Sequence, residues 1–353
     1  MRSFQPDYRN MFAVARNQRP ERLPFYEHYI NKESMESISG VSFPDYVHGD
    51  SKDIDEFFRL LCEFYVEHGY DCVSYETCVG EILPGAGALG RHQPGAIHCR
   101  EDFEKYPWHD LPRLYWEKAE RRFASLEKAL PPGMKIIGGV GNGPFEAAED
   151  LVGYENLCLM QYDDPELFQE LFMKLGELHC QLWAEMLKRR KDAFAICRIG
   201  DDMGFRTGTL MSPQTLIENV VPQYKRIIEA VHREGKPFLL HSCGCIFDIM
   251  ESLIEAGVNA KHSNEDAIAP FDKWIERYSS KIGLVGGIDT DRLCRQSPEE
   301  IYQSVLEDAS RFRRTARGYA LGSGNSIPPY VPKECYLAML RAGNEIRRRE
   351  GTL

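Results

Sequence analysis

The sequence has no uncharged apolar run approaching 18 residues, and its first residues lack the apolar core of a secretory signal. We therefore expect no membrane span and a cytoplasmic location. It also has no excess of positive charge, because 43 lysines and arginines stand against 54 aspartates and glutamates, a net charge of −11 over 353 residues. This balance argues against a nucleic-acid partner, which needs a basic surface.

Low-complexity segments and long linkers are absent as well. The 11 cysteines are scattered and odd in number, which indicates reduced thiols and not a disulfide framework. Hydrophobic residues make up 43% of the chain, enough for a large core, and this excludes global disorder.

Short β-rich runs alternate with amphipathic helical patterns along the chain. Apolar residues recur at helical spacing in 54–65, 167–182 and 216–231. The pairs Ser212-Pro213 and Ser297-Pro298 are typical of a helix N-cap followed by proline, and Gly235 is typical of a helix end. Eight runs have the composition of buried parallel strands: 24–29, 71–76, 135–140, 194–199, 237–241, 256–262, 282–287 and 318–322.

Eight strand–helix units predict an α/β fold, a single (β/α)₈ TIM barrel that spans residues 1–353. An open doubly wound sheet is the alternative. Two segments do not fit the repeat: an N-terminal extension of about residues 1–22, and a long loop region of about residues 81–108.

Polar residues stand at the ends of the predicted strands, where a barrel gathers its chemistry. Glu76, Asn325 and the adjacent Asp201 and Asp202 are the candidate catalytic or substrate-orienting residues. Two neighbouring carboxylates cannot both face the barrel interior, so we expect one to act at the site and the other to cap a helix.

His241 and Cys243 are the candidate metal ligands. Side chains two apart on an extended segment point the same way, and imidazole with thiolate suits zinc. Cys245 is one candidate for a third ligand; the others are Glu76, Asp202, His262 and the region 323–325. A buried strand end with a hydrogen-bonded histidine and an inert thiol is the alternative interpretation.

Several short blocks together resemble the uroporphyrinogen decarboxylase superfamily, whose members are (β/α)₈ barrels. They include Gly141-Asn142-Gly143-Pro144, Asp201-Asp202-Met203-Gly204, His241-Ser242-Cys243-Gly244 and Gly286-Gly287-Ile288-Asp289. The His-x-Cys block resembles the cobamide-dependent methyltransferase branch, which implies zinc on His241 and Cys243. The Arg-Gln-Ala-Gly-Arg stretch of the decarboxylases is absent from 19–24, and the cysteine ligand of the coenzyme M branch is absent from 322–328.

The resemblance implies a corrinoid-dependent methyltransferase. It would move a methyl group between a small donor or acceptor, of the methyl ether, amine or thiol type, and the cobalt of a corrinoid (cobalamin) supplied by a partner protein. Zinc would activate the substrate heteroatom, and Glu27 would supply a proton or complete the metal shell. The alternatives are a cofactor-free decarboxylase that uses Asp201 or Asp202, and a non-catalytic barrel that binds a small ligand. The direction of transfer and the oligomeric state stay open, with a homodimer as one candidate.

Overall fold

Seven parallel strands form one curled sheet whose spatial order follows the chain from β1 to β7. The computed structural model describes residues 4–91 and 93–353. The strands are β1 (Cys72–Cys78), β2 (Lys135–Gly141), β3 (Phe194–Gly200), β4 (Phe238–His241), β5 (Ala260–His262), β6 (Gly283–Ile288) and β7 (Tyr319–Ser323). All six neighbouring pairs run parallel, so the carboxyl ends of the strands meet at one face.

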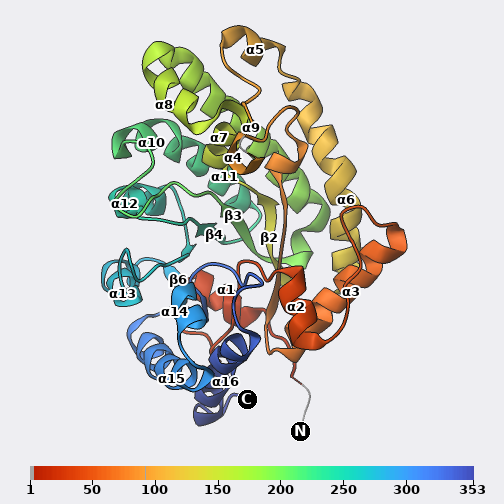
Figure 1. The fold of residues 1–353 in the computed structure, drawn as a ribbon, viewed down its shortest axis with the longest axis vertical. Coiled ribbons are helices and arrows are strands. Elements are labelled where there is room, and N and C mark those ends of the chain that lie inside the picture. Colours follow the sequence, from red (N-terminus) through yellow and green to blue (C-terminus); the bar gives the residue numbers. More distant parts are fainter. Residues whose placement is uncertain (1–3, 92) are drawn as a thin grey trace.

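Helices surround this sheet (Figure 1). The longer ones are α3 (Ser51–Glu67), α6 (Leu111–Ala129), α8 (Tyr154–Asp163), α9 (Pro165–Arg190), α11 (Val221–Arg233), α15 (Pro298–Thr315) and α16 (Lys333–Arg349). The shorter ones are α1 (Arg9–Ala15), α2 (Lys32–Ser39), α4 (Ala88–Arg91), α5 (Arg100–Lys105), α7 (Pro144–Val152), α10 (Pro213–Asn219), α12 (Phe247–Glu255), α13 (Phe271–Tyr278) and α14 (Thr290–Arg295). Three short 3₁₀ helices, η1 (Val79–Ile82), η2 (Trp108–Asp110) and η3 (Lys191–Ala193), complete the set within the described ranges.

The prediction of a closed eight-stranded barrel is wrong in one respect. The segment 24–29 makes a single parallel bridge to β7, between Phe25 and Leu321, and forms no strand. On its other side no backbone hydrogen bond to β1 occurs among the described residues. The His28 carbonyl oxygen accepts instead from the Ser74 hydroxyl at 2.7 Å and from Arg198 at 3.0 Å. Side chains therefore occupy the acceptor that strand pairing would use, and the sheet is TIM-barrel-like without closing.

The other seven predicted strands are confirmed, with small shifts at their ends. The run 256–262 shortens to β5 because its first residues end α12, where Gly257 adopts a φ of 113°. The helix predicted over 216–231 divides into α10 and α11, because Pro222 lies in the first turn of α11. The predicted caps are confirmed: Ser212 accepts from the Thr215 amide and Ser297 from the Glu300 amide.

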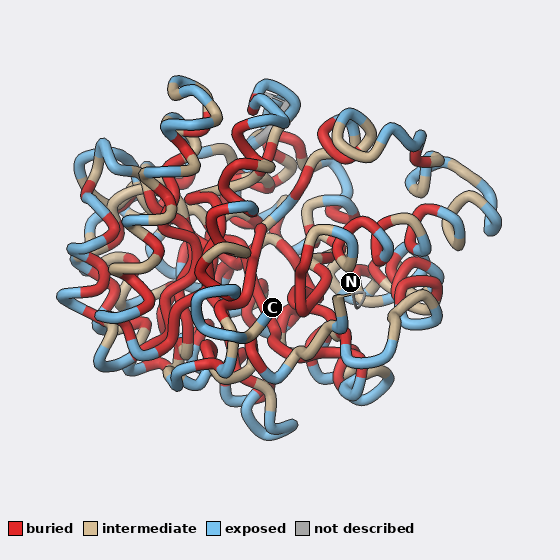
Figure 2. Tube along the Cα trace, turned by 90° about the horizontal axis from the view of Figure 1, so that it is seen from below, coloured by how far each residue is buried: buried red, intermediate tan, exposed pale blue. Residues whose placement is uncertain are grey.

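The amino end of the sheet is closed by α1, part of the predicted N-terminal extension. Met11, Val14 and Ala15 are buried in a cluster that continues into the strands through Ile137, Ile196, Leu239, Val285 and Ala320. A Cβ atom on Gly283 would lie 2.1 Å from the Val14 carbonyl oxygen, so only glycine permits this approach. Figure 2 shows buried chain through the middle of the molecule and exposed chain at its periphery.

The region predicted as a long loop, 81–108, contains α4, α5 and parts of η1 and η2, and it docks on α7. The Ile97 amide donates to the Leu151 carbonyl at 3.0 Å, and the Leu89 amide donates to the Asp150 carboxylate at 3.0 Å. No helix in the described parts of the chain is both long and apolar enough to cross a membrane.

Candidate metal centre

Two buried histidines meet where β4 and β5 end. The Nδ1 atoms of His241 and His262 lie 2.7 Å apart, and His262 Nε2 lies 3.0 Å from the Ser323 carbonyl oxygen. A carbonyl only accepts, so His262 carries its proton on Nε2, and its Nδ1 accepts the proton of His241 Nδ1. These two hydrogen bonds leave the Nε2 lone pair of His241 free to bind a metal ion.

Both histidines are neutral near pH 7. Burial, followed by the nearby His262 and Arg198, holds the pKa of His241 well below its usual range. Burial also lowers the pKa of His262 to about 3. A proton therefore does not compete with a metal ion for His241 Nε2 near pH 7.

Cys243 and Asp202 complete a group around His241 Nε2. The Cys243 sulfur lies 3.5 Å from that nitrogen, and an Asp202 oxygen lies 3.9 Å from it. The ligand atoms of the three residues lie within 4.8 Å of one another. Standard zinc–nitrogen and zinc–sulfur bond lengths at a tetrahedral angle place the two atoms about 3.6 Å apart. The observed spacing of these two atoms therefore suits zinc.

Two donors point at the Cys243 sulfur: Asn325 Nδ2 at 3.3 Å and the Ser263 hydroxyl at 3.5 Å. Burial, together with Asp202, raises the pKa of the Cys243 thiol to about 12. The free side chain is therefore a thiol at neutral pH, and ligation requires a cation to displace its proton.

The two neighbouring carboxylates take different positions, and the expected helix cap is confirmed for Asp201. Asp201 is fully buried and accepts from the Phe145 and Glu146 amides at 3.1 and 2.7 Å and from the Tyr224 hydroxyl at 2.7 Å. It thus caps the start of α7, and burial raises its pKa to about 7. The Asp202 side chain is 42% exposed and accepts from the Cys243 amide at 2.7 Å.

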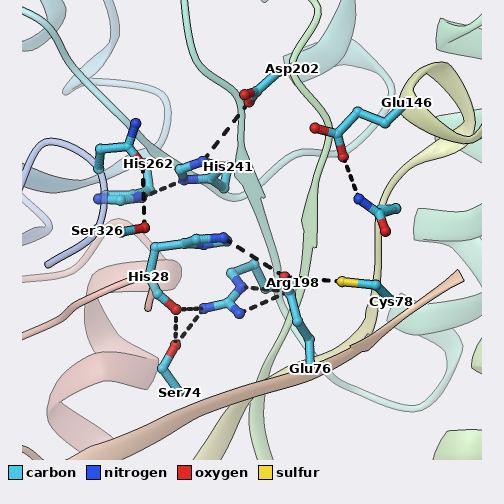
Figure 3. Close-up of polar contacts among 12 residues, drawn as sticks. His28, Ser74, Glu76, Cys78, Glu146, Arg198, Asp202, His241, His262 and Ser326 are labelled. Atoms are coloured by element: carbon cyan, nitrogen blue, oxygen red, sulfur yellow. Dashed lines mark hydrogen bonds and ion pairs between the residues drawn. The ribbon is translucent and has the colours of Figure 1, made fainter. Parts of the chain in front are cut away.

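Glu76 lies on the adjacent wall and not in the metal group (Figure 3). It accepts two hydrogen bonds from Arg198, at 2.8 and 3.2 Å, and lies 3.8 Å from His28 Nε2. The His28 ring stacks on His241 with ring centroids 3.7 Å apart. A second group of metal-ligand spacing, His28 with His241 and His262, is less suited to an ion because both nitrogens of His262 already have protein partners.

Glu27 is fully buried and contacts Ser323. Its carboxylate accepts from both the Ser323 amide, at 3.0 Å, and the Ser323 hydroxyl, and burial raises its pKa to about 8. The Ser323 carbonyl accepts a hydrogen bond from His262. By binding Ser323, Glu27 therefore helps to fix the hydrogen bonds that orient His241.

The structure thus brings His241, Cys243, Asp202 and Asn325 together, with Glu76 beside them and Asp201 behind. Cys245 belongs to none of the metal-ligand groups found among the described residues, because Gly244 turns the chain at a φ of 77°. Sequence reasoning missed Arg198, Ser263 and Lys261, a buried lysine whose ammonium donates to the Ser263 carbonyl oxygen. A lone arginine within the apolar strand β3 was a usable signal for Arg198; Ser263, at a φ of 95°, left none.

A curled parallel sheet with a histidine–cysteine–aspartate group at its carboxyl end defines a TIM-barrel-like protein with a candidate metal centre. A family profile for uroporphyrinogen decarboxylase (URO-D) matches residues 7–346. The chain therefore belongs to the uroporphyrinogen decarboxylase family, and this confirms the resemblance seen in the sequence. Membership indicates an enzyme.

Solved structures share the fold. A methyltransferase from Methanosarcina mazei is 16% identical, with a TM-score of 0.72 over 97% of this chain and 99% of that one. A B12-independent methionine synthase from Shewanella sp. W3-18-1 is 16% identical, with a TM-score of 0.52 over 93% of this chain and 96% of that one. A search of curated proteins finds no match.

Proposed function

We propose that this protein is a zinc-dependent methyltransferase that moves a methyl group between a small substrate and the cobalt of a corrinoid held by a partner protein. The observation that carries the proposal is the 3.5 Å spacing of His241 Nε2 and Cys243 Sγ, with Asp202 beside them, at the carboxyl end of the sheet. The family resemblance of the His-x-Cys block and the fold shared with a methyltransferase support it.

In this proposal His241, Cys243 and Asp202 hold the ion. Bound zinc supplies Lewis-acid chemistry to an oxygen, nitrogen or sulfur atom of the substrate. His262 keeps the Nε2 lone pair of His241 available, while Asn325 and Ser263 donate hydrogen bonds that offset the charge of the Cys243 thiolate. The partial exposure of Asp202 leaves an approach for substrate.

The corrinoid is a second substrate in this reaction. In the demethylating direction cobalt(I) contributes the electron pair of the new methyl–cobalt bond and becomes cobalt(III). The methyl–heteroatom bond breaks, its electrons stay on the heteroatom, and water supplies any proton that the product takes up. Methylation of a thiol is the same exchange run in reverse.

The decarboxylase alternative fits the charges of the site less well. Asp201, one of its two candidate groups, caps α7 from a fully buried position. Arg198 is buried and already paired with Glu76. A polycarboxylate substrate would therefore have to compete with Glu76 for the guanidinium of Arg198. A non-catalytic ligand-binding barrel gives no reason for a histidine–cysteine–aspartate group at metal-ligand spacing.

Metal analysis tests the proposal. We expect about one zinc per chain in the wild type, loss of zinc in the His241→Ala, Cys243→Ala double variant, and full retention in Cys245→Ala, the matched control two residues away. Methyl transfer to free cob(I)alamin, followed by its absorbance change, is expected to fail in the double variant alone. Activity that survives removal of zinc by a chelator would contradict the proposal.

A further inference from the structure

Lys261 is a buried lysine in the middle of β5, only 3% exposed, where a parallel strand ordinarily carries an aliphatic residue. Neighbouring side chains on a strand point to opposite faces, and the next residue, His262, faces His241. The Lys261 side chain therefore points outward to the helix layer, where its Nζ lies 4.0 Å from the centre of the Trp274 ring of α13. Burial lowers the pKa of this ammonium to about 7, so the fold keeps a lysine here against a desolvation cost.

The Lys261 ammonium donates a hydrogen bond to the carbonyl oxygen of Ser263, two residues further along the chain. Ser263 has a φ of 95°, a value that serine rarely adopts. Among the described residues, the other non-glycine residues with positive φ are Asn17 and Asn142, and asparagine tolerates such angles better than serine does. A strained backbone of this kind persists only where surrounding contacts hold it, and the Lys261 hydrogen bond is such a contact.

The strained conformation of Ser263 has a consequence at the candidate metal centre. The Ser263 hydroxyl lies 3.5 Å from the Cys243 sulfur and donates to it. A return of φ to the usual negative range would rotate the Ser263 side chain about its N–Cα bond through a large angle and carry the hydroxyl away from the sulfur. The hydrogen bond to the proposed ligand therefore depends on the backbone that Lys261 holds.

We propose that Lys261 is a positioning residue of the metal centre, because it holds Ser263 in the conformation that directs the serine hydroxyl at the Cys243 sulfur. This inference rests on the proposed function and names a residue outside the ligand group that sets the affinity of the group for zinc. Lys261 acts through Ser263 and is not itself a ligand.

Zinc affinity of the full chain, measured in competition with a chelator, tests the inference. Lys261→Met keeps the apolar stem against Trp274 and removes the donor, so we expect zinc affinity to fall about three- to tenfold, as for one lost hydrogen bond to a ligand. Lys273→Met is the matched control, since the Lys273 ammonium also lies over a ring, that of Phe247 at 5.4 Å, but on the exposed face of α13. Its zinc affinity is expected to stay within twofold of the wild type.

A double-mutant cycle with Ser263→Ala distinguishes positioning from a general structural role. Both residues act through one hydrogen bond, so we expect Ser263→Ala to lose as much zinc affinity as Lys261→Met, and the double variant to lose no more than either. Additive losses, or an unchanged affinity in Lys261→Met, overturn the inference. Should Lys261→Met fail to fold, Lys261→Gln takes its place in the cycle, because its amide ends one bond short of the Ser263 carbonyl.

The same measurements separate this inference from the proposed function. Zinc binding by the wild type that Lys261→Met leaves unchanged overturns the role of Lys261 alone. Zinc binding that Lys261→Met weakens, without methyl transfer to free cob(I)alamin from any ether, amine or thioether, overturns the methyltransferase and supports the role of Lys261 at the metal centre. A wild-type protein that binds neither zinc nor cobalt(II) overturns both.

Discussion

The two ends of the curled sheet are built from the same seven strands and differ in what their side chains do. At the amino end α1 inserts Met11 and Val14 among small and aliphatic residues, and the interior is closed by packing. At the carboxyl end His241, His262 and Cys243 are held by hydrogen bonds that leave one nitrogen and one sulfur directed at a common point. Packing thus stabilises one end, and directed polar contacts prepare the other for chemistry.

Two buried arginines show the same contrast. Arg347 lies at the amino end and donates to the Leu23 and Gly69 carbonyls, and burial lowers its pKa to about 9. Burial also opposes the charge of Arg198, but Glu76 raises its pKa above the usual value. Arg347 at the amino end thus binds backbone carbonyl groups, whereas Arg198 at the carboxyl end holds the Glu76 carboxylate beside the candidate site.

The strongest test of the contrast is steric. Gly283→Val at the amino end places a side chain against the Val14 carbonyl, and we expect it to cost at least about 4 kcal/mol of unfolding free energy or to prevent folding. Urea denaturation measures the change. Gly208→Ala at the carboxyl end, where a Cβ meets nothing within 4 Å, is the control and is expected to change stability by less than about 0.5 kcal/mol. Equal losses in the two variants would remove the distinction between the ends.

Histidines at the two ends give the next test. His262→Leu removes the acceptor that orients His241, so we expect zinc affinity to fall about 10- to 100-fold in competition with a chelator. His232→Leu removes a histidine that contacts Asn259 near the amino end, and we expect no change in zinc affinity. If His262→Leu binds zinc as the wild type does, His262 is not a positioning residue.

A buried acid distinguishes the carboxyl end by its pH dependence. Glu149 is 5% exposed, and burial, with Asp201 and Asp202, raises its pKa to about 8. Between its unfolded pKa near 4.5 and about 8, the unfolded chain releases this proton and the folded chain keeps it, so stability falls as pH rises, by at most about 1.4 kcal/mol per pH unit.

Glu149→Gln removes that dependence. We expect the variant to gain on the wild type by about 3 kcal/mol between pH 5 and pH 8, measured by urea denaturation at both pH values. Glu155→Gln, on the exposed face of the following helix, is the control. A difference between Glu149→Gln and wild type that does not grow with pH would show that Glu149 is ionised in the folded protein.

The smallest expected effect tests whether zinc affinity depends on the overall stability of the protein. Ser297→Ala removes the N-cap of α15 and is expected to cost about 1 kcal/mol of unfolding free energy. Because Ser297 contacts none of the proposed ligands, zinc affinity is expected to stay within twofold of the wild type. A parallel loss of zinc would mean that general stability, and not local geometry, governs the metal centre.

Much of the fold was predictable, because apolar runs and helix caps are local signals. Seven strands and the caps at Ser212 and Ser297 follow from neighbouring residues alone. The segment 24–29 has strand-like composition, but whether it pairs with β1 depends on Ser74 and Arg198, which are distant in sequence. Barrel closure was therefore beyond local pattern reasoning.

The candidate site divides in the same way. The spacing of His241 and Cys243 predicted a shared target, since an extended segment turns both side chains to one side. The sequence offered Asp202 and His262 as equal candidates for a further ligand, and nothing local separated them. The structure distinguishes these two candidates. Both ring nitrogens of His262 are hydrogen-bonded, to His241 and to Ser323, whereas the Asp202 carboxylate is partly exposed and can offer an oxygen to an ion.

The sequence by itself determined the alternation of strands and helices, the family, and the candidate ligand pair of His241 and Cys243 at the end of the fourth strand of the sheet. These rest on periodicity, composition and nearest neighbours. Only the tertiary structure decided that the sheet stays open beside the 24–29 segment, that His262 orients His241, and that Asp202 lies beside Cys243. These features arise where chain segments far apart in sequence compete for the same hydrogen-bonding groups and the same space.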